Sequence, residues 1–323
     1  MHAMIRKELA DHFSSLRFPL MSALIFMAAL VSANMAGDGI KAWLGDGMGL
    51  FLEGRIFLLL YSVPGAIWPV FMFIAYLGPL AAIMMGFDAV NRERLQGTLA
   101  KIMAQPVYRS EVLLGKYLAG LFTIALMLAA LLLLIAGFGL AAVGLVPTWA
   151  EVARLALFWL LSVAYLGFWL GAAMLMSILC RSALASALAS ASLWLFMAFF
   201  VSLMASGSAA ALAPAADPLR PAREEILAQG AIFRTISLAS PVNLYNEAAS
   251  FLLDPSRRSL YQRQEIMDKA VTDRYTGRFN GSLKLNQSLI LALPHLAGML
   301  AWTAFALCLS LSFFVKQEIR SIG

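Results

Sequence analysis

The hydrophobic pattern of the chain consists of long apolar runs separated by short polar segments. A helix that crosses about 30 Å of hydrocarbon needs roughly 20 apolar residues. Six runs reach this length, at residues 18–36, 65–87, 117–145, 152–179, 183–205 and 289–315. A shorter apolar piece at 56–63 predicts an interfacial or re-entrant segment. The pattern predicts an all-α polytopic membrane protein with six transmembrane helices.

The composition agrees with this class. The chain is 61% hydrophobic and 13% charged, with a mean hydropathy of +0.80, whereas soluble domains are about 45–50% apolar and about 25% charged. Its formal net charge of +6 does not indicate nucleic-acid binding, because the basic residues of a membrane protein mostly set its topology.

The basic residues of the short loops fall mainly on one side of the predicted spans, which indicates the cytoplasmic side. They are Arg6, Lys7, Arg17, Arg92, Arg94, Lys101, Arg109, Lys116, Arg181, Lys316 and Arg320. Both termini are therefore expected in the cytoplasm of a bacterial cell, with the protein in its inner membrane. Residues 1–205 and 289–323 form the predicted transmembrane domain, and 206–288 form an extracytoplasmic loop.

Two flanking segments have helical patterns of their own. Residues 4–17 place apolar side chains on one face, which predicts a helix in the membrane interface before a retained first span. In the loop, residues 206–221 are expected to be a linker, and helices are expected at 221–238, after Ser240-Pro241, and at 259–274. The apolar face of the second of these helices either lies on the outer leaflet or closes the mouth of a transport path. Its residues are Leu244, Tyr245, Ala248, Phe251 and Leu252.

No catalytic or metal-binding constellation is visible in the sequence. His2, His12 and His295 are too far apart along the predicted topology to share a metal ion. Cys180 and Cys308 form neither a disulfide framework nor a metal spacing. The methionines of the spans fit membrane packing better than copper passage. We therefore expect a noncatalytic chain that binds no cofactor.

The spans are expected to contain essentially no ionisable residue, which argues against a proton relay. The pair Gly115-Lys116 lacks the upstream glycine and the following Ser or Thr of a phosphate-binding loop. If the protein works on ATP, a partner chain must bind the ATP and its Mg²⁺.

A charged island interrupts the apolar pattern between the second and third runs, FDAVNRERLQGTLAKIMAQPVYRSEVLLGK at 87–116. Its apolar positions recur at helical spacing, which predicts one apolar stripe; they are Leu95, Leu99, Ile102 and Met103. Thr98 is a candidate helix cap, and Pro106 ends the helix. The stripe either docks into the groove of a soluble partner or lies on the lipid surface.

Several short motifs of this island resemble one family. They are Glu93-Arg94, Gly97-Thr98-Leu99, Pro106 with Arg109, and Leu114-Gly115-Lys116, together with the Arg6–Leu9 sequence RKEL before the first span. The chain is similar to permease subunits of ABC exporters with the type V fold, and within these to the nitrous-oxide-reductase maturation permeases.

The resemblance implies two permease copies, expected as a homodimer, with two ATP-binding subunits. The second and fifth spans would line the path, and a coupling helix within 88–109 would contact the ATPase. The implied coupling residues are Arg92, Glu93, Arg94, Leu95, Thr98, Leu99, Ile102, Met103, Pro106 and Arg109. The apolar spans favour a hydrophobic or amphipathic cargo. Two alternatives remain: a membrane scaffold that presents 206–288 to a periplasmic partner, and an uncoupled facilitator.

Overall fold

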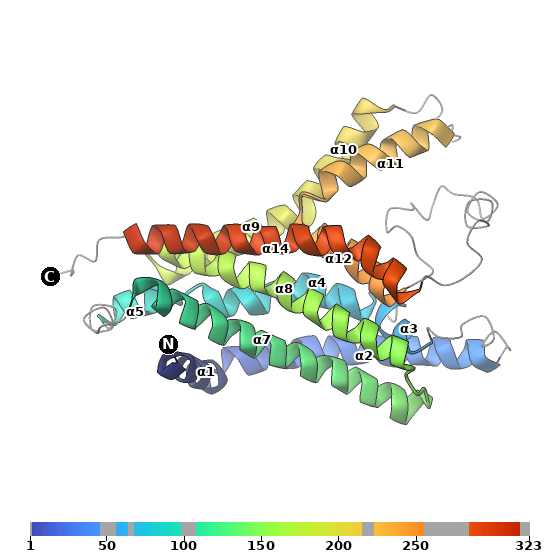
Figure 1. The fold of residues 1–323 in the computed structure, drawn as a ribbon, viewed down its shortest axis with the longest axis horizontal. Helices are drawn as coiled ribbons and strands as arrows, with labels where there is room; N and C mark the ends of the chain where they lie inside the picture. The colour runs from blue at the N-terminus through green and yellow to red at the C-terminus, as the bar shows by residue number, and fades with distance from the viewer. Residues whose placement is uncertain are drawn as a thin grey trace.

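The protein is a bundle of long helices with short helices packed at both ends (Figure 1). The computed structural model describes residues 2–45, 56–63, 68–97, 108–214, 223–254 and 284–316. Six helical segments in this part of the chain are long and apolar enough to cross a membrane. Their bounds are Arg17–Ala42, Val70–Leu95, Arg109–Val143, Trp149–Leu179, Ala183–Leu212 and Leu285–Lys316. The six predicted spans and the all-α class are therefore confirmed.

The helix α8 (Trp149–Leu179) is the centre of the bundle. It packs against α4 (Val70–Gly86), α7 (Arg109–Phe138), α12 (Pro241–Leu253) and α14 (Leu285–Lys316). A capping box begins α8: Thr148 accepts a hydrogen bond from the backbone N–H of Glu151, and the Glu151 carboxylate accepts one from Thr148. The second Glu151 oxygen accepts a hydrogen bond from the backbone N–H of Phe57 at 2.9 Å.

That last bond begins α3 (Ile56–Ser62), the short apolar piece ahead of the second span. Its residues from Phe57 to Ser62 are buried, and Tyr61 donates a hydrogen bond to the backbone carbonyl of Leu132 in α7. The segment 56–63 is therefore enclosed by the bundle and does not lie on its outer surface.

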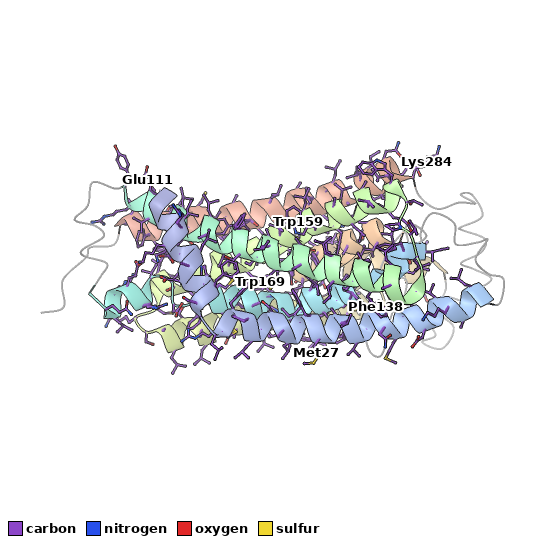
Figure 2. All side chains as sticks on the ribbon, turned by 90° about the horizontal axis from the view of Figure 1, so that it is seen from below. Met27, Glu111, Phe138, Trp159, Trp169 and Lys284 are labelled. Atoms are coloured by element: carbon purple, nitrogen blue, oxygen red, sulfur yellow. The ribbon has the colours of Figure 1, made fainter. Side chains whose placement is uncertain are left out.

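The N-terminal helix α1 (His2–Ser14) lies across one end of the bundle, at a steep angle to the long helices (Figure 2). It packs against α7 and precedes α2 (Arg17–Gly45). Glu111, near the start of α7, and Lys284, just ahead of α14, mark the two opposite ends of the bundle in Figure 2. The end with α1 is the predicted cytoplasmic end.

The predicted helices of the loop are present where the structure describes them. They are α11 (Arg223–Ser237) and α12, which Ser240 caps by accepting a hydrogen bond from the N–H of Val242. The helix predicted at 259–274 lies outside the described residues. The linker prediction for 206–221 is wrong in its first part, because α10 (Val201–Leu212) continues through an alanine-rich stretch with high helix propensity.

The apolar face of α12 was expected either on the outer leaflet or over the mouth of a transport path, and the structure contradicts the first of these. Every residue from Pro241 to Leu253 is buried, so this helix does not lie on a lipid surface. Tyr245 stacks on Tyr165 of α8 with ring centroids 4.4 Å apart and shares a hydrogen bond of 2.9 Å with Ser162.

By contrast, α9 (Ala183–Leu195), η3 (Phe196–Phe200) and α10 expose much of their surface. In Figure 1, α10 and α11 project together away from the long helices. Ser186 and Ser190 of α9 face inward, since both are buried. The leucine and phenylalanine side chains face outward and are available to lipid or to another protein chain.

Candidate functional site

The segment after the second span is fixed to the neighbouring helices by backbone contacts. The short helix α5 (Asn91–Leu95) follows a turn at the end of α4. Ser177 of α8 accepts hydrogen bonds from the backbone N–H groups of Val90, at 3.1 Å, and Asn91, at 3.2 Å. These N–H groups have no partner within α5 itself, so a hydroxyl of another helix caps it.

The end of α5 is equally well defined. Arg94 donates a hydrogen bond to the backbone carbonyl of Ile178 at 3.2 Å, which adds a second connection to the end of α8. Gly97 has a φ of 65°, a left-handed conformation that ends a helix and that glycine adopts without a steric penalty. The described part of α5 is thus one short helix held on the end of α8.

A buried ion cluster joins α5 to two further helices. The Lys116 ammonium of α7 lies 2.8 Å from a Glu93 oxygen of α5 and 2.7 Å from a Glu8 oxygen of α1. All three residues are buried in the fold. We call Glu8, Glu93 and Lys116 the Lys116 junction. Because one ammonium serves two carboxylates, a movement of α5 alters the electrostatic balance at α1 and α7.

A weaker contact lies beside this junction. Arg17, at the start of α2, forms an ion pair of 3.0 Å with Asp88 and lies over the Phe87 ring. Arg17 is largely exposed, and exposed ion pairs contribute at most about 1 kcal/mol. Burial lowers the pKa of His12 on α1, and the nearby Glu8 opposes that shift. His12 is therefore neutral at neutral pH, and Lys116 is the cation that binds α1 to α5.

The junction forms part of the wall of a cavity of about 860 Å³. Its lining includes polar side chains of α1 and α5 and methionines of α2, α4 and α8. These methionines are Met21, Met84, Met85 and Met174. The cavity gives α1 and α5 free volume between them at the predicted cytoplasmic end.

The structure divides the predicted coupling residues into groups. Glu93 and Arg94 point into the protein, whereas Arg92 is exposed and Leu95 is 75% exposed. Arg109 begins α7 and donates a hydrogen bond to the backbone carbonyl of Val315 at the end of α14. Thr98, Leu99, Ile102, Met103 and Pro106 lie outside the described residues.

Sequence reasoning did not assign site roles to Glu8, Lys116 or Ser177. Lys116 and Glu8 belong to the Leu-Gly-Lys and RKEL motifs that contribute to the family resemblance. Both residues could therefore have been noticed from these motifs, but a motif does not show which charged side chains face one another. Ser177 has no signal in the sequence that separates it from other span serines.

A second region of interest is an aromatic face on the predicted path-lining spans. Tyr76 of α4 stacks on Phe199 of η3 with ring centroids 5.9 Å apart, and Trp68 lies 5.1 Å from Tyr76. Phe199 and Trp68 are largely exposed. A π-helical turn at η3 directs Phe199 toward α4, and such turns are frequent at functional sites.

No three His, Cys, Asp or Glu side chains of the described ranges gather as candidate metal ligands. Cys180 and Cys308 are free thiols.

Comparison with known proteins decides the family. Residues 2–319 match the model of the ABC-2 family transporter protein. The chain belongs to the ABC-2 transporter family. It is 32% identical over 147 residues to the probable ABC transporter permease protein NosY of Pseudomonas aeruginosa, and this match covers 46% of each chain. It is 30% identical over 154 residues to the protein of the same name from Stutzerimonas stutzeri, which covers 48% of each.

The aligned stretch thus spans about half the length of these curated relatives. The family and the six apolar helices together indicate a multi-pass protein of the bacterial inner membrane.

Proposed function

We propose that this chain is the membrane permease subunit of an ATP-driven ABC exporter. In this proposal it forms the translocation path with a second copy of itself. Segment 88–109 couples it to two separate ATP-binding subunits, which bind and hydrolyse ATP with Mg²⁺. The chain itself is noncatalytic and binds no cofactor. The family match supports the transporter class.

One observation supports the coupling role most strongly. The helix α5 is anchored to α1, α7 and α8 on its inner side, through the Lys116 junction and Ser177, while Arg92 and Leu95 remain exposed on its outer side. A force applied to the exposed side would therefore reach three helices of the bundle. Glu93 and Arg94 transmit the movement in this proposal, and Arg92 and Leu95 contact the partner.

An aromatic face on the surface of the bundle supports an apolar cargo. The aromatic face consists of Tyr76 of α4, Phe199 of η3 and Trp68 just ahead of α4, and α4 and η3 belong to the spans predicted to line the path. Aromatic rings offer large contact area to hydrophobic and amphipathic molecules. The scaffold alternative gains no support from α12, because this part of the 206–288 loop is enclosed by other helices.

Replacing Leu95 with aspartate is expected to weaken binding of the ATP-binding subunit. A large apolar residue at the centre of an interface contributes about 2 kcal/mol, which corresponds to roughly 30-fold in affinity. The test is co-purification and ATPase stimulation with the ATP-binding subunit whose reading frame lies nearest to that of this chain. Stability should not change, because Leu95 is exposed.

The matched control is Val146→Asp, since Val146 is 79% exposed and lies between α7 and α8 at the opposite end of the bundle. This variant should bind and stimulate the ATPase as the unmodified chain does. Equal binding by Leu95→Asp and the unmodified chain would show that α5 is not the docking surface.

A further inference from the structure

A buried carboxylate connects three helices on the other side of the bundle centre from the Lys116 junction. Glu247 of α12 has no exposed surface, and α12 is enclosed by α14, α8, α4 and α3. One Glu247 oxygen lies 2.9 Å from the Arg234 guanidinium of α11, and the other lies 3.1 Å from Nε2 of His295 in α14. No motif in the sequence assigned a role to Glu247, so its pairing with His295 was not foreseen.

The Glu247 carboxylate depends on positive charge. Neither oxygen has an aligned hydrogen-bond donor among the described residues, so its stabilisation is electrostatic. A buried ionised group without compensating charge is costly by several kcal/mol. Arg234 is about half exposed, whereas His295 is buried beside the carboxylate. The charge on the His295 imidazole therefore strongly affects how well the Glu247 carboxylate is stabilised.

The other ring nitrogen of His295 defines where its first proton resides. Nδ1 lies 3.0 Å from the backbone carbonyl oxygen of Leu291. A carbonyl oxygen only accepts hydrogen bonds, so Nδ1 carries a hydrogen. In a neutral imidazole Nε2 then holds a lone pair that faces the Glu247 oxygen, and the two repel. A proton on Nε2 changes this repulsion into an ion pair.

The remaining polar groups around α12 have other partners. Arg154 of α8 donates to the Leu252 carbonyl and to Ser288, and Glu151 of α8 accepts from Phe57. Tyr61 of α3 donates to Leu132, and Tyr76 of α4 is hydrogen-bonded to Asn246. The Phe251 ring covers the imidazole edge-on. Within the described part of the chain, Arg234 and His295 are thus the cations against Glu247.

We propose that Glu247 and His295 form a proton-binding latch that holds α12 against α14, with Arg234 holding α11 on the same carboxylate. With the proton bound, imidazolium and carboxylate attract and α12 stays closed. When Nε2 gives its proton to water at the predicted outer side, the facing lone pair and carboxylate repel, and α12 is released from α14. The latch goes beyond the proposed transport function and does not require the ATP-binding subunit.

The proton is directly observable because the chain has only three histidines. The experiment uses the full-length chain in lipid nanodiscs with ¹⁵N-labelled histidine, and His2→Gln and His12→Gln assign the signals. In spectra recorded over a range from acid to alkaline pH, the His295 ring should lose the hydrogen of Nε2 and keep the hydrogen of Nδ1. In Glu247→Gln, which removes the facing negative charge, a smaller share of the rings should be doubly protonated in matched samples, while the control Glu225→Gln should leave that share unchanged.

A His295 ring that is neutral in every sample, or whose doubly protonated share is the same in Glu247→Gln, would overturn the proton site. The latch role has a separate readout, the hydrogen exchange of α12 corrected for intrinsic rates. Exchange should accelerate on the alkaline side in the unmodified chain and become independent of pH in His295→Lys, which keeps a fixed positive charge. Exchange in the unmodified chain that is the same at both ends of the range would overturn the latch.

Discussion

Replacing Lys116 with methionine is expected to lower the free energy of unfolding by about 3–5 kcal/mol. The substitution leaves the Glu8 and Glu93 carboxylates buried without the ammonium that lies 2.7 and 2.8 Å from them. Removing one partner of a buried ion pair is more damaging than removing all partners, because an uncompensated charge stays in a medium of low polarity. Denaturation in mixed detergent micelles measures the difference.

The triple variant Glu8→Gln, Glu93→Gln and Lys116→Met separates charge from packing. It contains no buried charge at the junction and should recover a large part of the lost stability, since neutral replacement of a buried ion cluster is often nearly neutral in stability. Lys41→Met, at an exposed position of α2, should change stability by less than about 0.5 kcal/mol. A Lys116→Met protein as stable as the unmodified chain would contradict the assignment of the junction as a structural connection.

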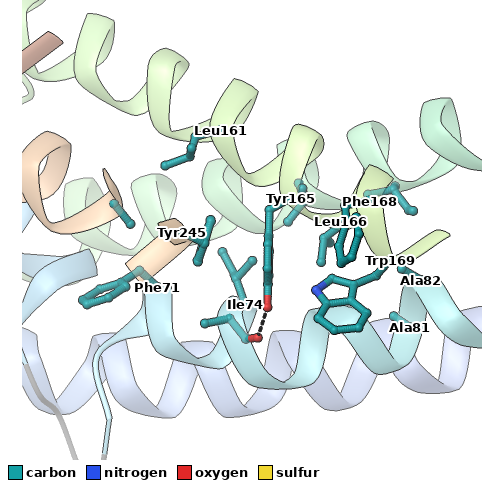
Figure 3. Packing of buried hydrophobic residues seen from close by; sticks show 14 of the residues in the cluster. Phe71, Ile74, Ala81, Ala82, Leu161, Tyr165, Leu166, Phe168, Trp169 and Tyr245 are labelled. Carbon is teal, nitrogen blue, oxygen red and sulfur yellow. Dashed lines mark hydrogen bonds between the residues drawn. The ribbon is translucent and has the colours of Figure 1, made fainter. Parts of the chain in front are cut away.

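Replacing Trp169 with alanine is expected to reduce stability by about 3–5 kcal/mol. Trp169 is completely buried on α8, where Figure 3 shows its ring beside Ala81 and Ala82 of α4 and near Phe168. Removing the indole ring leaves a cavity between α4 and α8. The small side chains of Ala81 and Ala82 cannot fill this cavity. Chemical denaturation checks the stability change, and ATPase stimulation checks whether coupling through α8 is lost with it.

Trp149 provides the control for this substitution, because it is 83% exposed at the start of α8. Trp149→Ala should lie within about 0.5 kcal/mol of the unmodified chain. If the two tryptophan variants lost similar stability, the central position of Trp169 in the bundle would be wrong.

The spans and helix ends were predictable because they depend on local patterns. A run of about 20 apolar residues is rarely found in a soluble protein and indicates a membrane span. Ser240-Pro241 indicates a helix start, because serine can cap a helix and proline suits its first turn. The structure begins α12 at Pro241, as this chemistry predicts.

The positions of the charged side chains were not predictable in the same way. Helical periodicity shows which residues share a face, but it does not show whether a polar face meets water or another charge. Periodicity alone therefore left Glu93 and Arg94 among the residues expected to contact a partner, although both side chains point inward. Lys116, Arg154 and His295 are buried toward the ends of long apolar helices, where the hydrophobic pattern gave no sign of their partners.

The central claim is that segment 88–109 receives the ATP-binding subunit of an exporter. Hydrogen exchange of the full-length chain in nanodiscs, with and without that subunit, tests it most directly. The account predicts slower exchange concentrated in peptides that cover 88–109, and loss of this protection in Leu95→Asp. Unchanged exchange in 88–109, with protection elsewhere such as in 206–288, would contradict it.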